Sequence, residues 1–344
     1  MKHHIFIYIR IIKMEQKQED EEEKEKEKEK EQDLNEAVEA GDIQRVKHIL
    51  DHSPNIDLSW SDNNLFALTA LQKSCQLGND EIVFLLLQYC HRSTVGNNLL
   101  SNIVNQKTKY SGSGPLLLAC EYGHHNIIRI LLSVPGIDVN QESNYEQTSF
   151  HMSCNKWQIL CFLSLFNDSR VNVNKPNKGG YTPLYYISAG GYLNNLMWMI
   201  SSDRQQCMDL GQPGDYKTDA IRAAKLYGRE KVLSLLTQFK EQPHETKHKS
   251  RLKIRWYQKC ASDMFALVIF VCDDLLQIKQ QNTIPNYDKS VRFFTIVKQL
   301  PMDLQMVLCN RYSGSMRTNI ITHDSEPAFK GLAQSYVLNS LWSQ

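Results

Sequence analysis

The side chains that could carry chemistry are scattered along this sequence rather than clustered. His124 and His125 are adjacent, and because neighbouring residues of a helix diverge on its surface, we interpret the pair as structural rather than metal-binding. The Ser-Gly-Ser-Gly-Pro stretch at 111–115 is rich in glycine but lacks the lysine of a phosphate-binding loop. The 11 histidines show no recognisable ligand spacing. The sequence therefore predicts no metal, no cofactor and no small-molecule substrate.

Known catalytic signatures are also missing from the sequence. It contains no P-loop, no His-Glu-x-x-His, no Gly-x-Ser-x-Gly and no kinase signature. We therefore expect a protein that is not an enzyme. The alternative is an enzyme whose site is assembled in three dimensions in the C-terminal part of the chain. A deep pocket there, lined by titratable groups with perturbed pKa values, would favour that alternative.

The net charge bears on the kind of partner, and the cysteines bear on the cellular compartment. The chain has 39 Lys and Arg against 38 Asp and Glu, a net charge of +1, and this balance gives no argument for nucleic acid or an anionic membrane. Nine cysteines are present, none in a Cys-x-x-Cys pair, and most lie in apolar runs. Free buried thiols in a reducing compartment follow, with the cytoplasm expected and the nucleus as an alternative.

Residues 1–32 are predicted to stand apart from the fold. The apolar stretch at 3–12 is interrupted by Arg10, so it falls short of the about 18 apolar residues that a membrane-spanning helix needs. Residues 15–32 are Glu, Lys, Gln and Asp, with Glu and Lys alternating over 23–31, and they include no apolar side chain to bury. Such a segment cannot offset the entropy of ordering, so we expect it to be disordered. A coiled coil and a partner-binding acidic arm are the alternatives.

A recurring pattern is the element that must position these side chains. In TPLYYISAGGYLNNLMWMI, at 182–200, Gly191 follows Pro183 by eight residues and apolar residues then recur at helical spacing. Similar segments place an anchor residue at positions 41, 78, 123, 157, 191 and 228. Two intervals are 34 residues, two are 37 and one is longer, and Trp157 replaces glycine in the fourth segment. The chain is therefore built from a repeated unit.

Each unit is predicted to contain two short helices. The first, for example at 184–189, stops at the anchor glycine, whose missing Cβ allows the left-handed conformation that ends helices. The second carries apolar residues at i, i+3, i+4 and i+7, with Leu131 and Leu235 expected in its buried stripe. A polar loop such as 171–181 returns the chain. One helix pair buries too little apolar surface to stand alone, so neighbours must stack.

This unit resembles the ankyrin repeat, which has a period of about 33 residues and a Thr-Pro-Leu-His start. The matches are Thr-Pro-Leu at 182–184, Gly-His at 123–124 and the Val-Asn endings at 139–140 and 173–174. Trp157 and an insertion around 91–108 depart from the pattern. The resemblance implies about six degenerate repeats in an all-α fold. It also implies an ankyrin-type α-solenoid with hairpin-like loops that binds a protein partner on its concave face.

We expect four segments along the chain. They are a disordered charged segment at 1–32, a repeat array at 33–240, a basic linker at 241–260 and a helical C-terminal module at 261–344. The linker is interpreted as solvated, with a nuclear-import or anionic-surface patch as the alternative. Its cations are Lys247, Lys249, Arg251, Lys253, Arg255 and Lys259.

Residues 300–310 resemble the opening helix of an F-box, because Leu300-Pro301 is followed by apolar residues at helical spacing. The resemblance implies an alternative function as substrate adaptor of a ubiquitin ligase. The simpler interpretation is a helix that begins at Pro301 and buries Leu304, Val307 and Leu308.

The predicted partner-binding residues lie on the loop tips and on the first helices. Counting four residues back from the proline position of each unit locates the loop tip, which is aromatic in several units. The two residues before each anchor are expected to face the groove. The candidates are Phe66, Leu77, Tyr122, Tyr145, Lys156, Tyr181, Tyr216 and Tyr227. Exposed aromatic side chains are typical interface anchors; the alternative is that the rings pack against neighbouring loops.

Overall fold

The structure is a computed structural model of the chain. It describes residues 28–53, 56–61, 67–92, 99–155, 158–204, 208–212, 215, 217–273, 297, 300–313, 320, 325 and 327–333. The chain divides into two compact units, unit 1 (Met1–Pro183) and unit 2 (Leu184–Gln344). Most of the charged segment predicted to be disordered lies outside the described residues, but 28–32 begin a helix that runs to residue 40.

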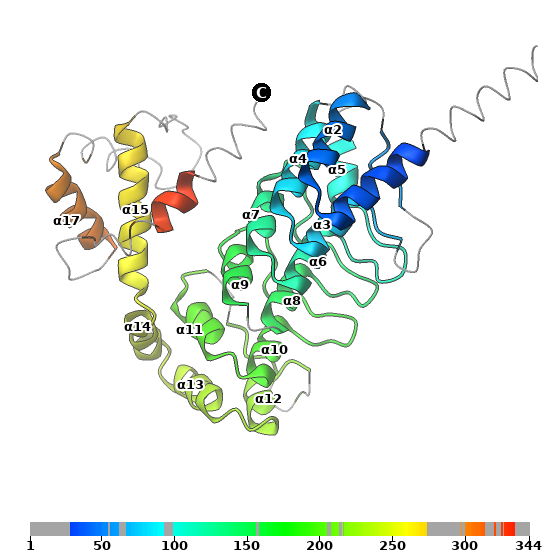
Figure 1. Ribbon diagram of the computed structural model, residues 1–344. Helices are drawn as coiled ribbons and strands as arrows, with labels where there is room; N and C mark the ends of the chain where they lie inside the picture. Colours follow the sequence, from blue (N-terminus) through cyan, green and yellow to red (C-terminus); the bar gives the residue numbers. More distant parts are fainter. Residues whose placement is uncertain are drawn as a thin grey trace, which may run out of the picture. The chain divides into compact units, whose positions relative to one another are not determined.

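Unit 1 is built from helix pairs (Figure 1). Its described helices are 28–40, α2 (Ile43–His52), α3 (Ala70–Leu77), α4 (Asp80–Arg92), α5 (Leu99–Val104), α6 (Pro115–Tyr122), α7 (His125–Ser133), α8 (Ser149–Asn155) and α9 (Ile159–Phe166). Apart from α5, which lies in the predicted insertion, they form successive pairs of a first and a second helix. The predicted all-α solenoid is confirmed.

The pairs stack in two rows. First helices contact first helices, α3 on α6 and α6 on α8, and second helices contact second helices, from α2 through α4 and α7 to α9. Figure 1 shows the first-helix row of unit 1 lying between the second helices and the long connecting loops. In the last pair, the rings of Phe150, Phe162 and Phe166 pack with centroids 5.2 to 6.3 Å apart. Stacking of neighbours thus creates the buried surface that one pair lacks.

Two asparagines, Asn105 and Asn140, each hydrogen-bond to the loop backbone of the next repeat. The Asn105 amide donates to the carbonyl of Gly136 and accepts from the N–H of Asp138, both at 2.8 Å. Asn140 repeats the arrangement with the carbonyl of Arg170 at 2.8 Å and the N–H of Asn172 at 2.6 Å. Because one side chain satisfies both a donor and an acceptor of the neighbouring backbone, it fixes the spacing between the repeats.

Two features of the fold require glycine at the anchor positions: a positive φ angle and a side chain of the next repeat that occupies the space of a Cβ. Gly78 ends α3 with φ 85°, a conformation that costs other residues about 1 to 2 kcal/mol. The ring of His124, from the next repeat, lies where a Cβ of Gly78 would be and is within 3.0 Å of the carbonyl oxygen of Gln76. His124 is therefore structural, as predicted.

The same packing recurs in the repeat that departs from the pattern. Residues 156–157, where Trp157 replaces the anchor, lie outside the described residues. The next residue, Gln158, still places its amide over Gly123 of the preceding repeat. The stacking contact therefore persists in that repeat.

Unit 2 contains two helix pairs, three further helices that carry labels and a helical segment at 327–333 in the part that the structure describes. The labelled helices are α10 (Pro183–Gly190), α11 (Leu193–Ser201), α12 (Ala220–Leu226), α13 (Glu230–Glu241), α14 (Pro243–Lys253), α15 (Trp256–Cys272) and α17 (Met302–Tyr312). Arg229 covers Gly191 as His124 covers Gly78, and its Nε donates to the carbonyl of Ala189 at 2.8 Å. In the buried stripe of α13, Leu236 is fully buried, whereas Leu235, predicted to be a core residue, is half-buried.

Helix α14 lies where the sequence predicted a basic linker. It begins with proline at its first turn and packs against α11 and α13, burying Thr246 and Ser250. Its charged sequence looks solvated because just one side of the helix is covered. The limits of the predicted array and of the C-terminal module otherwise stay predictions.

Helices α15 and α17 pack together around Phe265, Val268, Val297 and Cys309. The predicted buried stripe of α17 is wrong at Leu304, which is 50% exposed. Val307 and Leu308 are half-buried, whereas Gln305 and Cys309 are buried. The helix thus faces its core about one residue further along than its apolar residues indicated. No helix among the described residues is both long and apolar enough to cross a membrane.

His151 is a buried histidine in the helix start of the fourth repeat. Its Nδ1 accepts the backbone N–H of Thr148 at 3.2 Å and lies 2.9 Å from the Thr148 hydroxyl. Burial lowers the pKa of His151 to about 4, while hydrogen bonds to the carbonyls of Tyr181 and Lys175 raise it in part. The folded state therefore holds this imidazole in its neutral form at neutral pH.

Substituting Gly78 should destabilise unit 1 more than substituting Gly41. Both glycines have positive φ, so Ala adds backbone strain at each. At Gly41 the nearest atom to a new Cβ is Asn79 Nδ2 at 3.7 Å, whereas at Gly78 the His124 ring must move. We expect Gly78→Ala to lower the free energy of unfolding by about 1 to 2 kcal/mol more than Gly41→Ala. Urea denaturation measures the difference, and equal losses would contradict the packing role.

Acid should destabilise the fold partly through His151. Since its folded pKa of about 4 lies below the unfolded value of about 6.5, the unfolded state binds more protons between these values. The free energy of unfolding is therefore unaffected by the protonation of His151 above pH 6.5. As the pH falls from 6.5 to 4, protonation of His151 in the unfolded state lowers the free energy of unfolding by on the order of 3 kcal/mol. The urea midpoint should fall less between pH 7 and pH 4 in His151→Gln than in the wild type. His244→Gln, at an exposed site, is the control; an unchanged pH dependence in His151→Gln would refute the assignment.

Candidate partner-binding surface

Three successive loops of unit 1 lie side by side and are joined through their backbones. We call 108–113, 143–147 and 177–181 the tip loops. Each closes on itself, as in the bond from the N–H of Ser143 to the carbonyl of Gln147 at 2.9 Å. Neighbouring loops are linked by the N–H of Asn144 to the carbonyl of Ser111 at 2.9 Å and by the N–H of Lys178 to the carbonyl of Tyr145 at 3.0 Å. The tip loops therefore form a continuous ladder.

Two tyrosines project from this ladder into solvent. Tyr145, predicted from the sequence, is 66% exposed, and Tyr110, which the sequence reasoning missed, is 63% exposed. The carbonyl of Tyr110 accepts the side-chain amide of Asn144 at 2.7 Å, so the backbone at Tyr110 is held while its ring stays free of the core. Lys109 Nζ lies 5.9 Å from the centre of the Tyr110 ring, within cation–π range.

The other predicted loop residues differ from Tyr145. Tyr181 is half-buried, and its ring lies within 2.9 Å of where a Cβ of Gly179 would be. Tyr181 therefore packs on its own loop rather than on a neighbouring one. Phe66, Lys156 and Tyr216 lie outside the described residues.

The first-helix candidates are exposed at the C-terminal ends of their helices. Leu77 is 46% and Tyr122 is 48% exposed in unit 1, and Tyr227 is 50% exposed in unit 2. The Gln76 amide donates to the Tyr122 hydroxyl at 2.8 Å, which orients the ring at the end of α6. Tyr122 thus combines an exposed apolar face with a fixed hydroxyl, a combination common in interface anchors.

The titratable groups of unit 1 with shifted pKa values lie mainly in its core. Burial raises the pKa of the thiols of Cys75, Cys120 and Cys154, which occupy equivalent positions of three first helices. A thiol held protonated is a poor nucleophile, so these cysteines act as small apolar core residues. In unit 2, burial likewise raises the pKa of Cys260 and that of Cys309, the latter to about 12. Neither shift supplies an acid or base at neutral pH.

Comparison with known proteins names the repeated unit. A family profile described as ankyrin repeats, in three copies, matches residues 34–143. Residues 34–143 carry ankyrin repeats. The matched region contains α2 to α7 together with the first of the three tip loops and the start of the second.

Curated relatives share the repeats over limited lengths. Alpha-latrotoxin-Lh1a of Latrodectus hasselti is 32% identical over 92 residues, which is 26% of this chain and 7% of the toxin. A probable serine/threonine-protein kinase of Dictyostelium discoideum is 28% identical over 155 residues, 44% of this chain and 17% of the kinase. The chain therefore spans a small part of each of these relatives.

A solved structure shows the same fold. The ankyrin repeat domain of Bcl-3, a member of the IkappaB protein family, is similar with a TM-score of 0.50 and 17% identity over 60% of this chain and 85% of that chain. Ankyrin repeats are generally protein–protein interaction modules, and the array therefore carries a module of that class.

Truncating the exposed tyrosines should leave the ankyrin array folded. We expect Tyr110→Ala and Tyr145→Ala to change the free energy of unfolding by about 0.5 kcal/mol or less each, because neither ring is buried. Leu131→Ala, at a fully buried position of α7, should lower it by about 2 to 5 kcal/mol. Thermal or urea denaturation distinguishes these results. A loss of 2 kcal/mol or more at Tyr145 would show that its ring is part of the packing.

Proposed function

We propose that this chain is a non-catalytic scaffold or adaptor that binds a protein partner through the concave side of its ankyrin array. The binding surface in unit 1 consists of Tyr110 and Tyr145 on the tip loops and Leu77 and Tyr122 at the ends of first helices. The observation that carries the proposal is the exposure of these side chains on a backbone fixed by hydrogen bonds.

Physical chemistry favours these residues as contacts. A tyrosine has two side-chain torsions, so it loses little entropy when a partner covers it, and its ring brings a large apolar area. The loop ladder holds the backbone before binding, which reduces the entropy lost on association. Lys109 and Lys178 are also exposed on the tip loops. A partner surface with apolar pockets and acidic residues at its rim would complement this arrangement.

Further candidate contacts lie outside the residues that the structure describes, or in unit 2. Phe66, Lys156 and Tyr216 occupy positions that the repeat period makes equivalent to the exposed loop and helix sites, and Tyr227 ends α12 in unit 2. We include them as candidate contacts on the same grounds. Tyr181 is a weaker candidate because its ring packs on Gly179.

The two alternative functions stay predictions. The ubiquitin-ligase adaptor depends on 300–310, where Met302 and Leu304 at the start of α17 are 59% and 50% exposed and so are accessible to a partner. The enzyme alternative requires a titratable site in the C-terminal module. A cytoplasmic location, with the nucleus as the alternative, also stays a prediction.

Affinity capture with the full chain as bait tests the proposal. The double variant Tyr110→Ala/Tyr145→Ala should lose its partner, because each interface anchor contributes on the order of 1 to 2 kcal/mol, roughly five- to thirty-fold in affinity. The matched control is Leu160→Ala, which removes an exposed apolar side chain from the second helix α9. A partner that survives the double variant but is lost with Leu160→Ala would place recognition on the second-helix row instead.

A further inference from the structure

Helix α14 uses its cations in two rows, and the first row holds the helix in place. Lys247 and Arg251, four residues apart, each reach Asp203 at 2.7 Å. Arg251 also donates to the carbonyl of Ser201 at 2.7 Å and lies 5.6 Å from the Trp256 ring. These contacts lower the pKa of the Asp203 carboxyl, so the ion pairs persist at neutral pH. This row fastens α14 to the end of α11.

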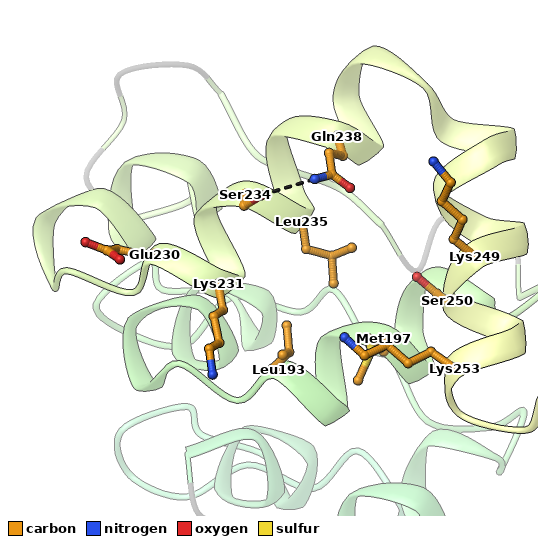
Figure 2. A pocket seen from close by; sticks show the side chains of 10 residues that line it. All are labelled: Leu193, Met197, Glu230, Lys231, Ser234, Leu235, Gln238, Lys249, Ser250 and Lys253. Carbon is orange, nitrogen blue, oxygen red and sulfur yellow. Dashed lines mark hydrogen bonds between the residues drawn. The ribbon is translucent and has the colours of Figure 1, made fainter.

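The second row, Lys249 and Lys253, lines a cavity instead. The cavity has a volume of 520 Å³ and lies between α11, α13 and α14. Leu193 and Met197 of α11 and Leu235 of α13 contribute its apolar lining. Figure 2 shows these three side chains between Lys231, from α13, on one side and the lysines of α14 on the other. We call this site the lysine groove.

The charge of the lysine groove is unbalanced. Three lysines and one acidic residue, Glu230, line it. Lys249 pairs with Glu245 of the same helix at 2.7 Å. Lys231 and Lys253 make no ion pair with any residue that the structure describes, and both are exposed. Two free cations therefore stand on opposite walls of an apolar cavity.

We propose that the lysine groove binds an acidic, amphipathic peptide segment of a protein partner. An apolar side chain of the peptide would cover Leu193, Met197 and Leu235, and carboxylates on either side would reach Lys231 and Lys253. An inorganic anion would leave the apolar lining uncovered. A flat anionic membrane would meet the rim lysines but would not fill a cavity of this size. The lining of the lysine groove thus fits a peptide with anionic groups on both sides of an apolar one.

This surface shares no residue with the tyrosine surface of unit 1, so the two proposals can fail separately. The lysine groove also suggests what the cations of the predicted basic linker do. Half of those in α14 anchor the helix, and the other half face a ligand site. The buried Ser250 and the exposed Ser234 and Gln238 add hydrogen-bonding groups at its edges.

Fluorescence anisotropy with the full chain tests the proposal. The probe is a fluorescein-labelled synthetic helix of glutamate and leucine in an i, i+4 pattern. It should bind the wild type, and more weakly as NaCl concentration rises. The double variant Lys231→Glu/Lys253→Glu should weaken binding by about ten-fold or more. The matched control is Lys240→Glu, an exposed lysine of α13 outside the groove, which should bind the probe as the wild type does.

Further probes separate this occupant from the others. A lysine–leucine helix and a glutamate–alanine helix should each bind at least ten-fold more weakly than the first probe. Tyr110→Ala/Tyr145→Ala should bind the first probe normally. Equal binding by Lys231→Glu/Lys253→Glu and the wild type would overturn the proposal. So would stronger binding to phosphatidylserine vesicles than to the peptide.

Discussion

The array depends on the contact between an anchor glycine and the side chain that the next repeat lays over it. His124 on Gly78, Gln158 on Gly123 and Arg229 on Gly191 are chemically different, yet each follows the anchor position of its own repeat directly. The glycine turns the chain from first to second helix and leaves room for its neighbour. Stacking in turn buries the apolar faces that no single pair can cover. Gly228 has no neighbouring atom within 4 Å of a Cβ, as expected where this series of contacts stops.

The loops, like the helices, are held by contacts from one repeat to the next. Asn105 and Asn140 satisfy the backbone of the following repeat with their side chains, and the tip loops bond to one another through their backbones. The tyrosine rings are therefore not needed to hold the loops. Side chains that the fold does not need are available for a partner. For this reason we propose that recognition uses Tyr110 and Tyr145 rather than the glycines or the helix stripes.

The sequence predicted the repeats well because their signals are local. A glycine that ends a helix and apolar residues at helical spacing can both be recognised within a stretch of about twenty residues. The misses depended on contacts between distant residues. Tyr110 escaped because the first tip loop closes from Thr108 to Ser113, one residue wider than the loop from Ser143 to Gln147, so a fixed count reached Ser111 instead.

Helix α14 and the stripe of α17 were missed for a related reason. The cations that looked solvated in α14 include two that pair with Asp203, more than forty residues away in sequence. In α17 the polar Gln305 is buried because its amide donates to the carbonyl of Leu300 at 2.8 Å, while Leu304 faces solvent. Composition alone cannot reveal a polar residue whose amide N–H group bonds to the backbone inside the fold.

Amide hydrogen exchange on the full chain, free and bound to a captured partner, tests the central claim most directly. We expect new protection in the tip loops 108–113 and 143–147 and at the end of α6, with little change in the buried helices α7 and α9. Protection confined to the second-helix row, with unchanged exchange in the tip loops, would contradict it.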